Sequence, residues 1–579
     1  MDIDRKTVIL SVMLLFAFSG CDKTPKSNEI PYTSYKDIPG ITQEEIQAIE
    51  EFQKDGHSFV YGMTPSTEAF RNRLGHIRGF SALVCQWLTQ VFEIPFVLQN
   101  FTYGDFIAKL ASFEIDFTSD IIYDEELLKT YFMTDPIAAH TIRYFRLAGS
   151  EPLSVIEEKR PLRYAFIRGT TTFRDVTSAL KPDSYQVIYF DNTDSVYHAL
   201  KKGEIDAFFN ECIRESAFDS YGDIVAHDFL PLTYTSVSLA TQNPKLKPII
   251  SVVQKALKSD VINYLSNLQK LGEREYHAHK LYMMLNEEER AYIRKNPVIN
   301  FVSEHYNYPI SFYNWYESEW QGIYYDVLKE MEELTGLSFK RINDNRTEWP
   351  ELLRLVTNGE AYMISELLRT EERKQIGFLW TETPSMVDNY ALLSKTKMPK
   401  VTLKEVLNAK VGLPRNTGYT EMFNAWFPNH KNTVYYESSN AAFDALENDE
   451  VDLVISSQRR LLALANYHEY SGYKANLVFD RKAESYFGFN KEHGVLCSIF
   501  NKAFRVIEVK NIADQWALKT YNNRGKLAKA QRPWLMGVSI LLLCALLFTV
   551  ALLLIKRNER QKLEDFDEEK AEIEKYEHG

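Results

Sequence analysis

The stretch GITQEEIQAIEEFQKDGHSFVYG (Gly40–Gly62) returns later in the chain as LNEEERAYIRKNPVINFVSE (Leu285–Glu304). Both segments are acidic and helix-like and lead into a short apolar run. Landmarks after them recur at offsets of 243 to 247 residues, namely Gly79 with Gly322, Tyr103 with Trp349, Asp206 with Asp452 and Lys255 with Lys502. Two copies of one module therefore fill residues 57–522. Because a solenoid repeat is only about 20–50 residues long, this is a tandem of whole domains.

Short strands and amphipathic helices alternate within each copy. The first copy opens with the strand-like SFVYGM (Ser58–Met63), and FSALVCQWLTQVF (Phe80–Phe92) then has apolar residues at helical spacings of three and four. A second alternating block begins near Arg163, and the chain then returns with YTSVSLATQ (Tyr234–Gln242). This pattern predicts an α/β fold with a mainly parallel sheet in each copy, divided into two lobes joined by a hinge.

Composition excludes several classes of function. The net charge is −12 and no dense block of Lys or Arg is present, so nucleic acid is not an expected partner. The five cysteines have no metal-ligand spacing, and no catalytic motif such as GxSxG, HExxH or a Walker-type loop occurs. We therefore expect no metal, no cofactor, no catalytic residue and no enzymatic activity. A small polar solute or another protein is the expected partner.

Both ends of the sequence predict contact with a membrane. Arg5 and Lys6, an apolar run and FSGC ending at Cys21 form an export signal that resembles a bacterial lipoprotein signal, which implies lipidation of Cys21. The 22 residues Trp534–Ile555 carry no charge and as a helix would extend about 33 Å, enough to cross a bilayer. We expect residues 22–533 outside the cytoplasmic membrane of a bacterium and a short charged tail, 556–579, inside.

The order of short motifs in both copies resembles the family 3 extracellular solute-binding proteins, which have the Venus flytrap fold. These motifs are Tyr308-Pro309 after the opening strand, Gly79-Phe80 and Gly322-Ile323 before the first helix, TEERK (Thr370–Lys374), TDP (Thr134–Pro136), RGTT (Arg168–Thr171) and GEIDAFF (Gly203–Phe209). The joint before the second copy resembles the linker in two-flytrap bacterial sensor kinases, here without a kinase domain. The resemblance implies two tandem bilobal periplasmic-binding-protein (type II) domains followed by one transmembrane helix.

The resemblance also implies ligand contacts in the second copy. In the family an Arg in a T-x-E-R turn holds the ligand carboxylate by a bidentate pair, and a helix start offers backbone N–H groups to the same carboxylate. Arg373 matches this Arg, Thr417 matches the helix-start hydroxyl, and Asn416 stands in place of a Gly. Ser457 falls where the family has the Asp that takes the ammonium group. The second copy is therefore expected to hold a carboxylate and to lack an ammonium partner. The alternative for Arg373 is a solvated pairing with neighbouring acids.

The first copy retains the other half of the contacts. Leu127 falls at the position of the Arg, whereas Gly169 and Thr170 keep the helix start and Glu211 takes the acidic place. This copy is expected to hold an amine or another cation. The alternative for Glu211 is a surface acid beside Arg214.

Aromatic residues near the opening strands complete the candidate sites. Tyr61, Tyr308 and Trp349 are expected to line the clefts, and the alternative for each is a place in the core.

The predicted domains are a signal peptide (1–21), a tether with a lead-in helix (22–56), solute-binding domain 1 (57–280), a linker (281–297), solute-binding domain 2 (298–522), a juxtamembrane segment (523–533), a transmembrane helix (534–555) and the tail (556–579). Together they predict an anchored receptor that binds a small polar solute between lobes and passes closure to the helix and to a homodimer or partner protein. The alternatives are the tethered binding component of a transporter and, more remotely, a dehydratase-like enzyme on the same fold.

Overall fold

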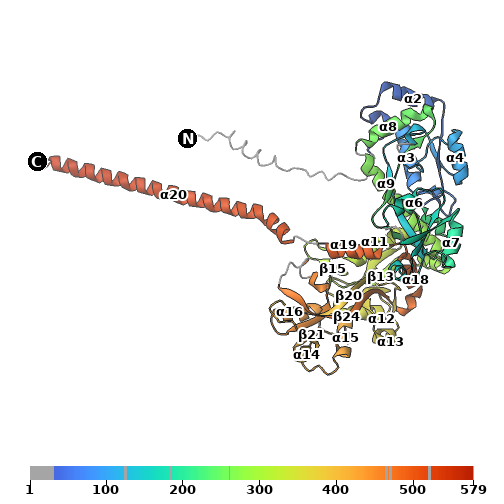
Figure 1. Ribbon diagram of the computed structural model, residues 1–579. Coiled ribbons are helices and arrows are strands. Elements are labelled where there is room, and N and C mark those ends of the chain that lie inside the picture. The colour runs from blue at the N-terminus through green and yellow to red at the C-terminus, as the bar shows by residue number, and fades with distance from the viewer. Residues whose placement is uncertain are drawn as a thin grey trace. The chain divides into compact units, whose positions relative to one another are not determined.

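The computed structural model describes residues 31–122, 127–180, 184–259, 261–462, 467, 472–519 and 523–577. The predicted export signal and the lipidation at Cys21 lie outside these residues. The chain divides into two compact units at Arg290 and Ala291, inside helix α10 (Glu287–Lys295). Each unit is an α/β structure of helices packed on sheets, as the alternating sequence pattern predicted (Figure 1).

The first unit contains twelve strands in the described ranges, which are β1 (Phe59–Met63), β2 (Phe70–Arg71), β3 (Ile77–Arg78), β4 (Phe96–Asn100), β5 (Phe132–Met133), β6 (Ala138–Leu147), β7 (Leu162–Ile167), β8 (Tyr185–Phe190), β9 (Ala207–Glu211), β10 (Ile224–Asp228), β11 (Tyr234–Val237) and β12 (Ala240–Thr241). Its described helices are α2 (Gln43–Lys54), α3 (Phe80–Phe92), α4 (Tyr103–Ala111), α5 (Leu153–Glu157), α6 (Thr172–Thr177), α7 (Thr193–Lys201), α8 (Lys247–Leu257) and α9 (Val261–Met284).

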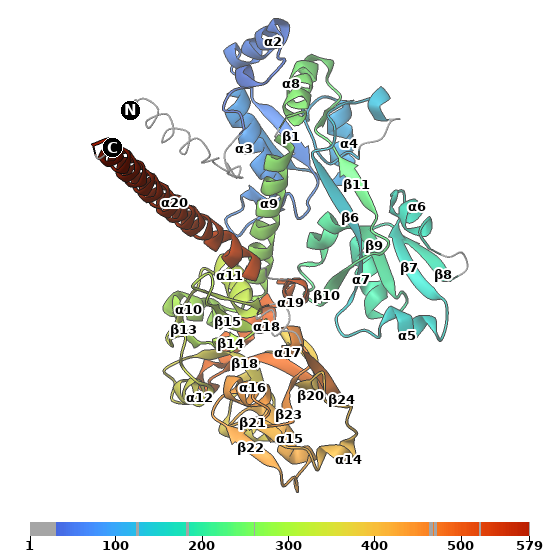
Figure 2. The same ribbon diagram turned by 90° about the vertical axis from the view of Figure 1, so that its left-hand side faces the viewer.

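These elements form two lobes. In the first lobe β1 pairs in parallel with β4, and α3 buries a wide apolar face that includes Trp87, Leu88 and Phe92. In the second lobe the strand order is β10-β6-β9-β7-β8, with β11 also paired to β6 (Figure 2). The chain passes from the first lobe to the second along β6 and returns along β11, as the sequence predicted for a hinged, bilobal module.

The second unit repeats this plan with strands β13 (Val298–Val302), β14 (Tyr306–Asn307), β15 (Ser311–Asn314), β16 (Glu319–Gln321), β17 (Ser338–Arg341), β18 (Met363–Leu368), β19 (Leu379–Trp380), β20 (Met386–Lys395), β21 (Val411–Pro414), β22 (Thr433–Tyr436), β23 (Leu453–Ser457) and β24 (Tyr473–Phe489). Its further helices are α11 (Ile323–Thr335), α12 (Trp349–Thr357), α13 (Glu371–Ile376), α14 (Leu403–Val406), α15 (Gly418–Trp426), α16 (Ser439–Glu447), α17 (Arg460–Leu462), α18 (Gly494–Ala503), α19 (Val509–Leu518) and α20 (Asn523–Glu577).

Long strands connect the two lobes of the second unit. Strand β24 pairs with β18 of the first lobe through Ser485–Phe489 and with β20 of the second lobe through Tyr473–Ser485. The resulting sheet has the order β17-β13-β18-β24-β20-β23-β21-β22. Ser485 therefore marks the point where β24 changes from one lobe to the other.

The repeated glycines Gly79 and Gly322 have the same structural role in both units. Each precedes the first long helix with a positive φ, +105° for Gly79 and +126° for Gly322. A Cβ on Gly79 would lie 2.6 Å from the carbonyl oxygen of Glu68, and one on Gly322 would lie 2.5 Å from that of Ile310. Both positions therefore require a residue without a side chain.

Helix α20 contains the predicted membrane span. Trp534–Asp567 is long and apolar enough to cross a membrane by length and composition, and the predicted segment Trp534–Ile555 lies within it. The helix runs without a break from Asn523 to Glu577, so the predicted juxtamembrane segment and most of the charged tail are helical too (Figure 1).

Candidate functional site

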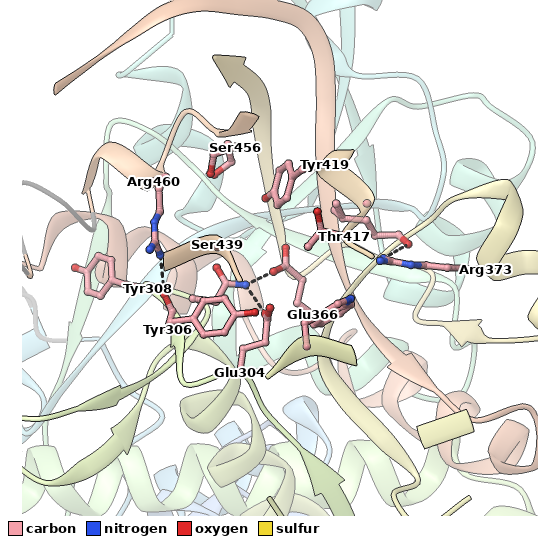
Figure 3. Close-up of a pocket in the computed structure, with 15 residues that line it drawn as sticks. Glu304, Tyr306, Tyr308, Glu366, Arg373, Thr417, Tyr419, Ser439, Ser456 and Arg460 are labelled. Carbon is pink, nitrogen blue, oxygen red and sulfur yellow. Dashed lines mark hydrogen bonds between the residues drawn. The ribbon is translucent and has the colours of Figure 1, made fainter. Parts of the chain in front are cut away.

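A small pocket lies in the cleft of the second unit. The first lobe contributes Glu304, Tyr306, Asn307, Tyr308, Trp349, Glu366, Leu368 and Arg373, and the second lobe contributes Thr417, Gly418, Tyr419, Ser439, Ser456, Ser457 and Arg460. The cavity measures about 50 Å³. Residues of both lobes therefore line one small cavity (Figure 3).

Two buried carboxyl groups lie next to each other on the first-lobe side of this pocket. Glu304 follows β13 and Glu366 lies on β18, and their exposed fractions are 6% and 5%. The amide nitrogen of Asn307 donates to both, at 2.6 Å from Glu304 Oε2 and in a short hydrogen bond to Glu366 Oε2 (Figure 3). The hydroxyl of Ser485 also donates to Glu366, so the pair is held at the crossing point of β24.

The surroundings of this pair disfavour two negative charges. Burial raises the pKa of Glu304 to about 8, and the charge of Glu366 adds to the rise. Burial also raises the pKa of Glu366, although its hydrogen bonds from Ser485 and Asn307 oppose the rise. In the described part of the chain no Lys or Arg forms an ion pair with either carboxylate. A cation between them would relieve both effects because it favours the charged form of each acid.

The expectation that this cleft lacks an acidic partner for an ammonium group is therefore wrong. Ser457 does line the pocket where the family places an acid, but the acids of this chain come from the first lobe. Glu304 is the last residue of the repeated segment Leu285–Glu304, and no motif marks its side chain as part of a site. Nothing in the sequence linked it to Glu366, because neither acid belongs to a motif.

Arg373 is buried beside the pocket, with an exposed fraction of 3%. Its Nη1 donates to the carbonyl oxygen of Leu368 at 3.1 Å, and its guanidinium lies 5.3 Å from the ring centre of Trp349. Its Nη2 lies 3.6 Å from Glu421 Oε1, a carboxylate on α15 of the opposite lobe. The alternative of a solvated Arg373 that pairs with neighbouring acids is wrong, because the side chain points inward and its ion partner comes from the other lobe.

Arg460 is a second buried guanidinium that the sequence analysis did not single out. It begins α17 on the second lobe, where its Nη1 donates to the backbone oxygen of Tyr306 at 2.6 Å and its Nη2 to Asn440 Oδ1 at 3.1 Å. The first of these bonds joins the two lobes across the pocket (Figure 3).

Of the predicted helix-start residues, Thr417 lines this pocket, and Asn416 lines a second cavity that shares Arg373 and Thr417 with it. Thr417 caps α15 by accepting a hydrogen bond from the backbone N–H of Thr420, and its hydroxyl donates to Pro414 O at 3.0 Å. Asn416 has a positive φ of 56°, and its carbonyl oxygen accepts a 2.7 Å hydrogen bond from the indole nitrogen of Trp349. The hydrogen bond from Trp349 to Asn416 thus joins the two lobes. The ring of Trp349 is also part of the core cluster around α12.

Tyr308 links the pocket to the end of the second unit. Its hydroxyl donates to the carbonyl oxygens of Trp516 at 3.3 Å and Lys519 at 3.1 Å, at the carboxyl end of α19. The indole of Trp516 donates to Asp326 on α11 at 2.6 Å. A pocket residue therefore contacts the helix that comes directly before α20 in the chain.

The predicted residues of the first unit are not brought together in one cavity. Gly169 and Thr170 are exposed at the start of α6, and the Thr170 hydroxyl donates to Ile167 O. Tyr61 is fully buried in the core of the first lobe. Glu211 is partly buried and accepts a 2.9 Å hydrogen bond from Thr235.

Arg214 fills the space next to Glu211. It lies on the second lobe, and its Nε is 4.0 Å from Glu211 Oε2. Across the cleft its Nη2 donates to Asp120 Oδ1 at 3.0 Å and its Nη1 to the hydroxyl of Thr64 at 2.6 Å. The backbone N–H of Thr67 also donates to Ile213 O at 2.9 Å. A cation of the chain itself thus bridges the two lobes across the first cleft.

A buried His–Glu pair lies beside this bridge. His140 Nε2 is 3.2 Å from Glu68 Oε1, and the two side chains are 1% and 7% exposed. Burial lowers the pKa of His140, but the charges of Glu68, Glu211 and Asp120 and the hydrogen bond to Glu68 together raise it above its usual value. The acids of the first cleft are therefore paired with Arg214 and His140, which belong to the same chain.

Comparisons with known proteins found similarity only among solved structures. No family model and no curated protein matches the chain. The B. pertussis BvgS periplasmic domain is 16% identical, with 84% of this chain and 96% of that chain covered and a TM-score of 0.42. The BvgS VFT2 domain is 20% identical (40% and 98% covered, TM-score 0.36), and a Gly52Ala mutant of arginine-bound ArgBP from T. maritima is 14% identical (37% and 98% covered, TM-score 0.33).

These matches agree with the predicted resemblance to tandem Venus flytrap domains. Because their TM-scores lie below 0.5, the fold assignment rests on the strand order and the two-lobed units described above. The chemistry available to the chain follows from its own residues. The second cleft presents two carboxyl groups to a small cavity, and the first cleft has its acids paired internally.

Proposed function

We propose that the protein is a membrane-anchored extracytoplasmic receptor that binds a small solute with an ammonium or guanidinium group in its second cleft. The observation that carries this proposal is the buried pair Glu304 and Glu366, which lines a cavity and has no ion-pair partner among the described residues. Such a pair is costly to ionise unless a cation sits beside it. The open and closed arrangements of the two lobes are the two states of the proposed receptor.

Calorimetric titration of the full-length protein in nanodiscs tests the ligand class. We expect at least one of methylammonium, methylguanidine, putrescine or glycinamide to bind, and Glu304→Gln to weaken that binding by about 100-fold, since a charge-assisted bond to a buried carboxylate is lost. Glu437→Gln is the matched control, because this side chain is 82% exposed and should leave affinity unchanged. Binding of acetate or succinate in place of every amine would contradict the proposal.

We further propose that closure reaches α20 through Tyr308. Ligand binding transmits a signal only if it favours one of two states of this contact. The hydroxyl of Tyr308 holds the carboxyl end of α19, so closure that moves the pocket aromatic also moves the chain that leads into α20. The predicted membrane orientation and the homodimer or partner protein belong to this proposal.

Disulfide crosslinking of full-length protein with Gly537→Cys in a Cys544→Ala background tests transmission. Ligand should change the crosslinking yield across the dimer at least twofold, and Tyr308→Phe should remove this change while keeping ligand affinity within about threefold. Tyr435→Phe serves as the control, because its hydroxyl contacts Asn424 and not α19. If Tyr308→Phe responds like the unmodified protein, the proposed route is wrong.

A further inference from the structure

We infer that the second cleft selects amines that carry no carboxylate, because Glu421 already stands as the counter-ion of Arg373. This inference rests on the proposed function and specifies its ligand. The resemblance to the family 3 solute-binding proteins implies that Arg373 holds a ligand carboxylate. The structure instead places a carboxylate of the chain itself beside this guanidinium, on the lobe that closes over it.

The electrostatic partner of Arg373 is Glu421. Burial lowers the pKa of Arg373, and among the charges that oppose this effect Glu421 ranks before Glu366 and Glu304. Glu421 lies on the first turn of α15, and its side chain is 23% exposed. Closure of the lobes therefore brings these two opposite charges to within 3.6 Å of each other.

Charge balance in the closed cleft also disfavours a ligand carboxylate. The two linings contain four acids, Glu304, Glu366, Glu372 and Glu421, and three permanent cations, Arg373, Arg415 and Arg460. A singly charged amine brings the sum to zero when all four acids are ionised. In that same ionisation state a zwitterionic amino acid would leave a net negative charge, and this is unfavourable in a buried site.

The start of α15 is packed against the first lobe at Gly418. A Cβ on Gly418 would lie 2.8 Å from Cδ1 and 3.0 Å from Cβ of Leu368, so the helix start packs directly on β18. The hydroxyls of Thr417 and Thr420 both donate to Pro414 O, at 3.0 Å and 2.5 Å. The two hydroxyl groups at this helix start are thus used within the chain.

One donor remains available to a neutral group. Arg373 Nη2 is buried and makes no hydrogen bond, since Glu421 lies beyond hydrogen-bond distance. An amide or hydroxyl oxygen would satisfy this donor without adding a charge. A compact amine with a neutral oxygen acceptor, such as an amino amide or an amino alcohol, fits both ends of the pocket.

Paired ligands test the inference on the full-length protein in nanodiscs. Calorimetry compares glycine, alanine and lysine with their amides, which keep the ammonium group and lose the carboxylate. We expect an amide to bind at least 30-fold more tightly than its amino acid. Glu421→Gln should reduce that ratio to about threefold or less by strengthening amino acid binding, because Arg373 then lacks a counter-ion. Glu437→Gln, whose side chain is 82% exposed, should leave the ratio unchanged.

The outcomes separate the inference from the proposed function. If an amino acid binds to the unmodified protein more tightly than its amide and Glu304→Gln weakens that binding, the inference is overturned and the proposed function stands. If no amine binds, or if Glu304→Gln leaves amine binding unchanged, the proposed function fails and the inference fails with it. The comparison of amides with acids needs no variant, so it decides the question even if Glu421→Gln fails to fold.

Discussion

Replacing Glu304 by Gln is expected to remove the largest loss of stability that the unliganded second unit shows as the pH rises from 5 to 9. In the native protein the pKa of Glu304 is about 8, whereas an unfolded Glu titrates near 4.3. The folded state therefore binds a proton more tightly than the unfolded state. Its contribution to stability is fully present below the unfolded pKa and is lost as the pH rises through the folded pKa. The loss from pH 5 to pH 9 is on the order of 4 kcal/mol.

The groups that face Glu304 set the size of this effect. Glu366 raises the pKa through its charge, whereas Asn307 and Tyr306 lower it by donating hydrogen bonds and Arg373 lowers it by its positive charge. Urea unfolding of the full-length protein, followed by pulsed hydrogen exchange of β24 peptides, reports on this unit alone. Glu437→Gln should keep the steep pH dependence. A variant Glu304→Gln with the native slope would show that another group titrates.

Substituting Gly322 by Ala is expected to destabilise the second unit by about 4 kcal/mol. The φ of +126° is disfavoured for any residue with a Cβ, and the new atom would meet backbone oxygens of Ile310 at 2.5 Å and Pro309 at 2.9 Å. Backbone cannot yield as a flexible side chain can, so the first lobe must shift at the start of α11.

Gly336 provides the matched control for this substitution. It also has a positive φ, +74°, but nothing lies within 4 Å of its Cβ position. Gly336→Ala should therefore cost only about 1 kcal/mol, the strain of the backbone conformation alone. Equal losses of unfolding free energy for the two variants, measured by urea unfolding and exchange of β24 peptides, would contradict the proposed clash.

The sequence predicted the fold better than the site, and the reason is physical. The repeat of Gly79 as Gly322 reflects a backbone position that every copy of the module needs, so it survives in both halves. Alternating strands and helices follow from local periodicity, and so does the apolar span in α20. These features depend on neighbours in the chain, which a sequence displays directly.

The acid pair could not be predicted in this way. Glu304 and Glu366 come from separate strands, and burial of a Glu side chain is rare enough that neither was expected inside. Arg460 was missed for the same reason. Arg373 was identified by its motif, but its partner Glu421 lies on the other lobe and only the folded chain brings the two together.

The hydrogen bond from Arg214 to Asp120 places a guanidinium group of the chain itself in the first cleft, where it competes with any free cation. A guanidinium attached to the same chain is present at its site at millimolar or higher effective concentration and never diffuses away. A free cation must displace it, so its apparent affinity falls by the fraction of time for which the bridge is open. The bridge therefore weakens binding of a free cation in the first cleft, and under the proposed function the solute binds in the second.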